Sequence, residues 1–228
     1  MCRLRPLGYG ARSKLNKAVQ VVVLTLVTMG TAQAETIKVV ALGDSLTAGY
    51  GLPQGDGFVP QLQAWLTEEG VDAEIVNAGV SGDTTAGGLA RLDWSLDPDV
   101  DAMIVALGGN DLLRGIPPES SRENLEAILT QVSGARGLPV LLIGLEAPGN
   151  YGPDYKAAFD GMYPALATQF DALLEQNFLA PLVIDGDLAA ARARFMQADG
   201  IHPNKEGVAQ IVAAFGPRVA ELVARAEP

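Results

Sequence analysis

The chain has 228 residues, of which 48% are hydrophobic and 19% are charged, and its formal net charge at neutral pH is −11. This length and apolar content suffice for one domain with a substantial core. The acidic balance excludes a protein that binds phosphate backbones through a basic surface, so we expect no nucleic-acid partner.

The first segment, residues 1–34, is predicted to be a secretory signal peptide. Basic residues precede an apolar run over residues 18–29, and residues 32–34 (Ala-Gln-Ala) fit the small-residue rule for cleavage. The apolar run falls short of the roughly 20 residues that a membrane-spanning helix needs, so we expect no stable membrane anchor. A lipoprotein is disfavoured because Cys2 precedes the run. The protein is thus predicted to be periplasmic or secreted.

Cleavage after Ala34 would leave one mature domain over residues 35–228. It would remove the only cysteine and five basic residues, leaving 11 basic against 27 acidic residues, a net charge of −16. The exported domain could then form no disulfide and offer no thiol to a metal or substrate.

Short apolar runs alternate with amphipathic stretches along the mature chain. The runs are rich in Val, Ile and Leu, which is typical of strands buried on both faces; they cover residues 37–43, 73–79, 101–109, 139–146 and 181–186. The amphipathic stretches predict helices over residues 58–70, 84–96, 119–134, 155–177 and 204–226. This alternation indicates one α/β domain with a five-stranded parallel sheet between two helical layers.

Polar, glycine-rich turns follow the predicted strands. Three of them cover residues 43–51, 77–85 and 108–115, and DGIHPN (199–204) follows the fifth predicted strand after a short helical piece. Ligands of doubly wound sheets bind beyond the carboxyl ends of the strands. We therefore expect these turns to meet at one edge of the sheet and to form a site there.

Each notable residue in these turns also has a plain structural explanation. Ser45 could cap a helix, Gly82 could supply a positive φ angle, and Asn110 and Asp199 could close turns. His202 is the only histidine in the chain, and a lone histidine is more often structural than catalytic. The residues gain significance only as a set.

As a set, these residues satisfy the needs of a serine nucleophile. A serine hydroxyl requires a base, the base requires an orienting carboxylate, and the oxyanion requires fixed donors. His202 must be the base if imidazole activates Ser45, because the chain has no other. Asp199 lies three residues earlier in the same predicted loop. Gly82 and Asn110, with the Ser45 N–H, can supply uncharged donors.

The blocks GDSLTAGYG, SGDTT, LGGND and DGIHPN occur in this order. With them the chain resembles the SGNH branch of the GDSL hydrolases, in particular the secreted bacterial arylesterases and the multifunctional thioesterase I/lysophospholipase group. The resemblance covers nearly the whole mature domain and implies a three-layer, flavodoxin-like α/β/α fold. It also implies a serine esterase that works through an acyl-enzyme and requires no metal or organic cofactor.

By motif, the resemblance assigns the catalytic triad to Ser45, Asp199 and His202 and the oxyanion hole to Ser45, Gly82 and Asn110. The substrate would be a small acyl or aryl ester, with thioesters or lysophospholipids as further candidates. Asp44, Asp83 and Asp111 flank these residues, and we expect structural roles for all three.

Segment 146–155 is rich in glycine and proline and resembles the substrate-side loop of the thioesterase I group. The resemblance implies a wall or lid for the acyl chain, with a plain surface loop as the alternative. Its candidate substrate contacts are Pro148, Asn150 and Tyr151. Apolar residues of the motif turns could line the acyl site or belong to the core; these are Leu46, Leu112, Ile116 and Ile201.

Other classes lack their sequence signals. No G-x-S-x-G nucleophile elbow of an α/β-hydrolase is present. A single histidine excludes H-E-x-x-H, and neither phosphate-loop nor dinucleotide-binding glycine motif occurs. A non-catalytic binding module is disfavoured because every triad member is present. A carbohydrate O-deacetylase or acyltransferase on the same fold remains the alternative, although 6% aromatic residues favour acyl or aryl esters over sugars.

Overall fold

The structure is a computed structural model that describes residues 1, 35–183, 186 and 188–227. Glu35–Pro228 form one compact unit. The predicted signal peptide, apart from Met1, lies outside the described residues, and so do two residues of the predicted strand 181–186.

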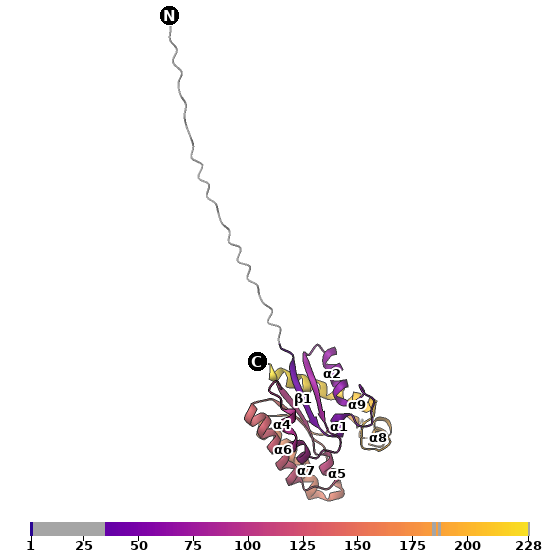
Figure 1. Ribbon diagram of the computed structural model, residues 1–228. Helices are drawn as coiled ribbons and strands as arrows, with labels where there is room; N and C mark the ends of the chain where they lie inside the picture. Colours follow the sequence, from indigo (N-terminus) through magenta and orange to yellow (C-terminus); the bar gives the residue numbers. More distant parts are fainter. Residues whose placement is uncertain (2–34, 184–185, 187, 228) are drawn as a thin grey trace. The chain divides into compact units, whose positions relative to one another are not determined.

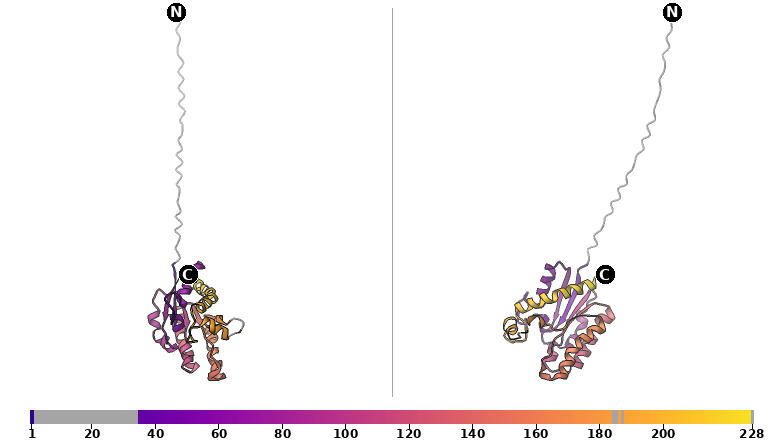
Figure 2. Two further views of the ribbon diagram at one scale, coloured as in Figure 1. Left: turned by 90° about the vertical axis from the view of Figure 1, so that its right-hand side faces the viewer. Right: turned by 180° about the vertical axis from the view of Figure 1, so that it is seen from behind.

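A parallel sheet forms the middle layer (Figures 1 and 2). Its strands are β1 (Ile37–Gly43), β2 (Ala73–Gly79), β3 (Ala102–Ala106), β4 (Val140–Ile143) and β5 (Leu173–Glu175), in the order β2-β1-β3-β4-β5. Every neighbouring pair is parallel. This strand order is that of flavodoxin-like sheets, whose ligand site lies where the order reverses, between β1 and β3. The predicted fold class is confirmed.

The helices cover both faces of the sheet (Figure 1). The longer ones are α2 (Phe58–Glu68), α6 (Pro118–Leu129), α7 (Pro153–Phe170), α8 (Leu188–Phe195) and α9 (Lys205–Ala226). The shorter ones are α1 (Ser45–Ala48), α3 (Thr85–Ala90), α4 (Leu92–Ser95) and α5 (Gly109–Leu113), with η1 (Thr130–Ala135), η2 (Gly149–Tyr151) and η3 (Ala180–Leu182) as a π-helical and two 3-10 segments.

The core has two halves because alternate residues of a strand point to opposite faces. Val39 and Ile104 pack with the buried residues of α2 and α9. Val40 and Val105 pack on the other face with those of α6 and α7. Burial on both faces explains why the strands read as continuous apolar runs rather than as alternating ones.

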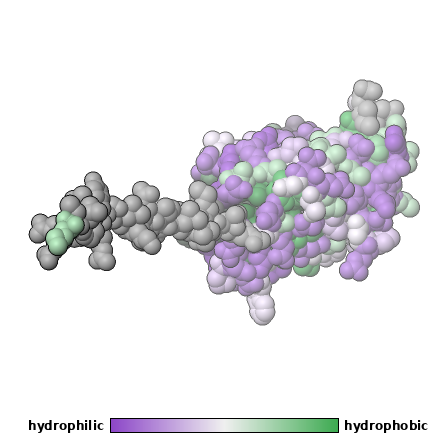
Figure 3. All heavy atoms as spheres, turned by 90° about the horizontal axis from the view of Figure 1, so that it is seen from above, coloured by the Kyte–Doolittle hydropathy of each residue, from purple (hydrophilic) through white to green (hydrophobic). Residues whose placement is uncertain are grey.

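Helix α9 is long and apolar enough, by length and composition, to cross a membrane. Its apolar side is however buried in the core, with Ile211, Val219 and Leu222 fully covered. A core helix passes the same test of length and composition. On the face seen in Figure 3, hydrophilic side chains predominate and apolar ones form patches between them.

The predicted fifth strand and the end of the fourth predicted helix are wrong. The helix predicted over 155–177 ends at Phe170, and the fifth strand, Leu173–Glu175, lies inside that range. Asp171 adopts a left-handed conformation with φ of 51° and its N–H bonds to the Ala167 carbonyl, which stops the helix without a glycine. Pro181 and Leu182, predicted as strand, belong to the 3-10 segment η3 (Ala180–Leu182) instead.

Candidate active site

Ser45 is the first residue of α1, and only Asp44 separates it from the end of β1. The carboxylate of Asp44 caps this short helix, with Oδ1 accepting a hydrogen bond from the Leu46 N–H at 3.0 Å. The strand and the cap together hold Ser45, half-buried, at the carboxyl edge of the sheet. This edge is where a doubly wound fold places its ligand.

His202 and Asp199 come from the loop between α8 and α9. The Nε2 atom of His202 lies 2.9 Å from the Ser45 Oγ, and its Nδ1 atom lies 2.7 Å from Asp199 Oδ2. The serine hydroxyl, imidazole and carboxylate therefore form one hydrogen-bonded chain, although Ser45 and His202 are 157 positions apart in the sequence.

Hydrogen bonds within the loop keep the Asp199 carboxyl group ionised next to the imidazole of His202. Its Oδ1 accepts hydrogen bonds from the backbone N–H groups of Ile201, at 2.9 Å, and His202, at 3.1 Å. The hydrogen bond to the His202 side chain, followed by these backbone bonds, lowers the pKa of Asp199 to about 2. A carboxylate that stays ionised fixes the ring tautomer and stabilises a protonated imidazole.

Gly82 lies in the turn after β2, and Asn110 lies in the first turn of the short helix α5, which follows β3. The Asn110 Nδ2 donates a hydrogen bond to the Asp83 carbonyl at 2.9 Å and lies 3.5 Å from Asp44 Oδ2. Gly82 has a φ of 90°, a conformation that favours glycine, and its carbonyl accepts from Arg114 at 2.9 Å. Two hydrogen bonds, from Asn110 to Asp83 and from Arg114 to Gly82, therefore join the segment after β3 to the segment after β2.

Asp83 and Asp111, which flank the proposed oxyanion donors in the sequence, hold the segments at the carboxyl edge of the sheet together through hydrogen bonds and an ion pair. Asp111 is fully buried and accepts hydrogen bonds from the Thr85 N–H, the Thr85 hydroxyl and the Ser121 hydroxyl. Asp83 pairs with Arg91, whose guanidinium also bonds to the Gly43 carbonyl. These contacts join the turns after β1, β2 and β3.

Asp44, the residue before Ser45, is buried, with 2% of its surface exposed. Burial raises the pKa of Asp44 to about 6, against the opposing effects of the Leu46 N–H and of His202. Within residues 35–183, 186 and 188–227, no three histidine, cysteine, aspartate or glutamate side chains gather into a set that could bind a metal ion.

Sequence reasoning missed two residues that hold the His202 loop in place. The Tyr50 ring packs on the imidazole of His202, with ring centroids 4.6 Å apart. The Gln197 side chain donates hydrogen bonds to the Tyr50 carbonyl, at 2.8 Å, and to the Pro203 carbonyl, at 3.0 Å. A Cβ at Gly51 would collide with the Gln197 oxygen. Tyr50 lies within the GDSLTAGYG block, but no sequence pattern links it to Gln197.

A small apolar cavity of about 140 Å³ opens beside Ser45. Its walls include Leu46, Leu112, Leu113, Leu145, Leu179 and Ile201, together with Asn110 and Glu146. The structure thus brings three of the predicted substrate contacts, Leu46, Leu112 and Ile201, to this cavity. It adds Leu145, which follows β4, and Leu179, which follows β5. Gly82 and Ile116 are not among its lining residues.

The other predicted substrate contacts lie elsewhere. Pro148, Asn150 and Tyr151 do not line the cavity beside Ser45. The Tyr151 ring packs against Tyr155, with centroids 4.9 Å apart, and lies against Gly115. Only the start of segment 146–155, at Glu146, reaches the cavity.

Residues 41–210 match the family described as GDSL-like Lipase/Acylhydrolase. The chain is 44% identical over 174 residues to Esterase TesA of Pseudomonas aeruginosa PAO1, which covers 76% of this chain and 83% of that protein. It is 38% identical over 185 residues to Thioesterase 1/protease 1/lysophospholipase L1 of Escherichia coli K12, with 80% and 82% covered.

Among solved structures, AlinE4, an SGNH-hydrolase family esterase, matches with a TM-score of 0.65 and 42% identity, over 83% of this chain and 98% of that one. The family match covers more than half of the chain and agrees with the sheet order and the strand-end site described above. This chain therefore belongs to the GDSL/SGNH family of lipases and acylhydrolases, and it is a carboxylic ester hydrolase.

Proposed function

We propose that Ser45, His202 and Asp199 are the catalytic triad with which this chain hydrolyses its ester substrate. The observation that carries the proposal is the continuous chain of contacts from Ser45 Oγ through His202, at 2.9 Å, to Asp199, at 2.7 Å. Both distances lie within the range for direct proton transfer and orientation.

The reaction takes place in two acyl-transfer steps. His202 Nε2 accepts the hydroxyl proton as Ser45 Oγ attacks the ester carbonyl, and Asp199 stabilises the resulting imidazolium. The imidazolium then gives this proton to the leaving alcohol, which departs and leaves an acyl-enzyme. Water attacks the acyl-enzyme in the same way and releases the carboxylic acid and the free serine.

The oxyanion of each tetrahedral intermediate is held by the N–H groups of Ser45 and Gly82 and by the side-chain amide of Asn110. The tie between Asn110 Nδ2 and the Asp83 carbonyl, at 2.9 Å, supports this role because it fixes the amide before the substrate arrives. Donors that need no reorientation give the largest electrostatic stabilisation of a transition state.

The proposed substrates are acyl or aryl esters, with thioesters and lysophospholipids as further candidates. The names of the relatives, an esterase and a thioesterase/lysophospholipase, support this range. The cavity beside Ser45 supports it too, because its walls are mainly leucine and isoleucine side chains. Such walls suit an alkyl or aryl group rather than a sugar.

The experiment is a hydrolysis series on purified protein with p-nitrophenyl esters from acetyl to hexadecanoyl and with phenyl acetate. We expect turnover in the wild type and none above background in Ser45→Ala and His202→Ala, with unchanged circular dichroism. Ser120→Ala, at an exposed position of α6, is the matched control and should retain full activity. Full activity in Ser45→Ala or His202→Ala would refute the triad.

We further propose that the protein is exported and that residues 1–34 are removed. The basic start, the apolar run and the Ala-Gln-Ala site support this. Expression of the full chain in a Gram-negative host, followed by cell fractionation and N-terminal sequencing, tests it. A periplasmic product that begins at Glu35 is expected, whereas an uncut cytoplasmic product would contradict export.

A further inference from the structure

An exposed carboxylate lies among the apolar walls of the cavity beside Ser45. It belongs to Glu146, which follows β4 and lines the cavity together with leucine and isoleucine side chains. Asp44, the other carboxyl group in the wall, is buried and accepts a hydrogen bond from the Leu46 N–H. Among the described residues that line this cavity, none is a lysine or an arginine. The charge of Glu146 is therefore not balanced within the cavity wall.

Helix α7 fixes the backbone that carries Glu146. The N–H of the next residue, Ala147, donates a hydrogen bond to Asp160 Oδ1 at 2.8 Å, and Lys156 Nζ donates to the Ala147 carbonyl at 2.8 Å. Lys156 and Asp160 are also paired with each other at 2.7 Å. These contacts hold the start of segment 146–155 at the cavity.

The same contacts leave the Glu146 carboxylate without a partner. The hydrogen bond to Asp160 is the main cause of the raised pKa of Lys156, and the charge of Glu146 adds a smaller part. The Lys156 ammonium group is thus bonded to Asp160 and to the Ala147 carbonyl rather than to Glu146. Within the described part of the chain, the Glu146 side chain makes no hydrogen bond or ion pair. A charged group of a substrate could therefore pair with it without displacing another contact.

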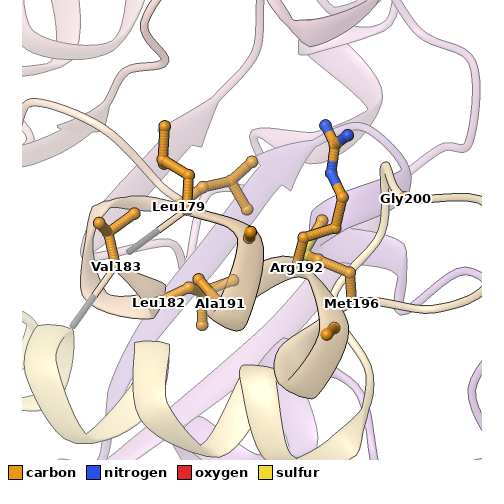
Figure 4. A pocket seen from close by; sticks show the side chains of 10 residues that line it. Leu179, Leu182, Val183, Ala191, Arg192, Met196 and Gly200 are labelled. Atoms are coloured by element: carbon orange, nitrogen blue, oxygen red, sulfur yellow. The ribbon is translucent and has the colours of Figure 1, made fainter. Parts of the chain in front are cut away.

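A second apolar hollow, of about 710 Å³, lies beside α8 and shares Leu179 with the cavity of Ser45 (Figure 4). Among its described lining residues the charged one is Arg192, which has the opposite sign to Glu146. A cation is therefore favoured at the cavity of Ser45 and disfavoured at this hollow, and the reverse holds for an anion. The two charges make the place of a charged group in a substrate testable.

The chemistry of the proposed reaction brings the acyl chain to Glu146. The tetrahedral carbon carries Ser45 Oγ, an oxyanion, the leaving group and the acyl chain. The oxyanion faces its donors, including Asn110, and the leaving group must face His202 Nε2 to receive the proton. The cavity beside Ser45 is what remains for the acyl chain, so the methylene groups of the chain contact the apolar walls and a charged group on the chain meets Glu146.

We propose that Glu146 selects esters whose acyl chain carries an ammonium group and disfavours those whose acyl chain carries a carboxylate. This inference rests on the proposed function, because it assumes that Ser45 is the acylated residue. An ammonium group beside Glu146 forms an ion pair that the apolar walls shield in part from water, whereas a carboxylate at the same place is repelled.

The test compares three p-nitrophenyl esters that share a hexanoyl chain. The chain ends in a trimethylammonium group, in a tert-butyl group of the same shape without the charge, or in a carboxylate. We expect the wild type to prefer the ammonium ester to the carboxylate ester. Glu146→Gln should lower the ratio of kcat/KM for the ammonium ester to that for the tert-butyl ester by about threefold or more, the usual size for a partly shielded ion pair. The ratio of the carboxylate ester to the tert-butyl ester should rise.

Two control variants remove a charge elsewhere. Glu68→Gln removes the same charge at the exposed end of α2, and Glu68 is not among the residues that line the cavity. Arg192→Gln removes the charge of the other hollow. Both should leave the two ratios unchanged. An equal shift in Glu68→Gln would assign the selectivity to the net charge of the molecule, and a shift in Arg192→Gln alone would place the charged group at the other hollow. Either result, or unchanged ratios in Glu146→Gln, would overturn the proposal.

Reversing the charge gives a second measurement. Glu146→Lys should prefer the carboxylate ester to the ammonium ester, and added salt should narrow the preference in both proteins because ions screen the pair. A wild-type order of preference in folded Glu146→Lys would also overturn the proposal. The tert-butyl ester keeps this proposal apart from the triad: its Ser45-dependent turnover supports the triad whatever the charged esters do, and its absence in the wild type would refute the triad instead.

Discussion

The side-chain amide of Gln197 donates a hydrogen bond of 2.8 Å to the backbone carbonyl of Tyr50. The same amide donates to the Pro203 carbonyl at 3.0 Å, and the Gln197 N–H donates to the His202 carbonyl at 2.8 Å. One residue thus joins the segment after the Ser45 helix to the loop that carries His202. Gln197 is a positioning residue for the contact between Ser45 and His202.

Replacing Gln197 by alanine should lower kcat by about one to two orders of magnitude, because a displacement of reacting groups by about 1 Å has this effect. KM should change little, since Gln197 does not line the cavity beside Ser45. Steady-state kinetics on the acetyl ester checks this split. Gln176→Ala is the matched control, as the Gln176 side chain is exposed and makes one long hydrogen bond of 3.4 Å. A fall in stability with normal kcat would show that the link is merely structural.

The sequence predicts the first four strands because they are buried on both faces and read as unbroken apolar runs. The fifth could not be found in this way, since Leu173 and Leu174 continue the apolar spacing of α7 and no glycine separates them from it. The stop comes from Asp171 in a left-handed conformation. Few non-glycine residues adopt this conformation, so a residue type alone does not signal it.

The residues of the candidate site also fall into those that the sequence predicts and those that it does not. Residues within the motif blocks could be named from the sequence, because three of the blocks follow β1, β2 and β3 and strand ends meet at one edge. The fourth block, residues 199–204, lies between α8 and α9 and was named from its resemblance to the family motif. Leu145, Leu179 and Gln197 could not be named, because their roles depend on how distant loops face one another. Pro148 and Tyr151 were predicted as substrate contacts because their segment resembles the substrate-side loop of the thioesterase I group, but they are not among the residues that line the cavity of Ser45.

Asn110→Ala should lower kcat by on the order of 10² to 10³, the usual effect of losing one oxyanion donor. KM should change much less, because the donor acts on charge that develops only in the transition state. Kinetics on the butyryl ester measures both. Asn124→Ala is the control: its amide bonds to the Thr85 hydroxyl at 3.1 Å, at the same end of the sheet but not to any triad residue. Near-normal kcat in Asn110→Ala would remove Asn110 from the oxyanion hole.

Asp44→Asn should change how stability depends on pH. Burial raises the pKa of Asp44 from its usual 3.8 to about 6, so the folded protein holds this proton more tightly than the unfolded chain does. The stabilisation from the proton is present at low pH and is lost as pH rises toward and through about 6. The difference between the two pKa values corresponds to roughly 3 kcal/mol.

Relative to the wild type, Asp44→Asn should therefore gain roughly 2–3 kcal/mol in unfolding free energy between about pH 4 and pH 7. Denaturant unfolding of both proteins across this range measures the difference. Asp83→Asn serves as the comparison, because Asp83 is paired with Arg91 and only partly buried. A constant difference across the range would mean that Asp44 is not held in its neutral form.

Thr47→Val should stabilise the protein. Thr47 is 1% exposed, in the short helix that begins at Ser45, and within the described part of the chain its hydroxyl oxygen is buried without a hydrogen-bond partner. An unsatisfied buried hydroxyl costs about 1–3 kcal/mol, and valine keeps the branched shape without it. We expect a gain of about 1 kcal/mol in thermal or denaturant unfolding. Thr47→Ser retains the hydroxyl and should be less stable than wild type. A loss of stability in Thr47→Val would show that the hydroxyl is satisfied.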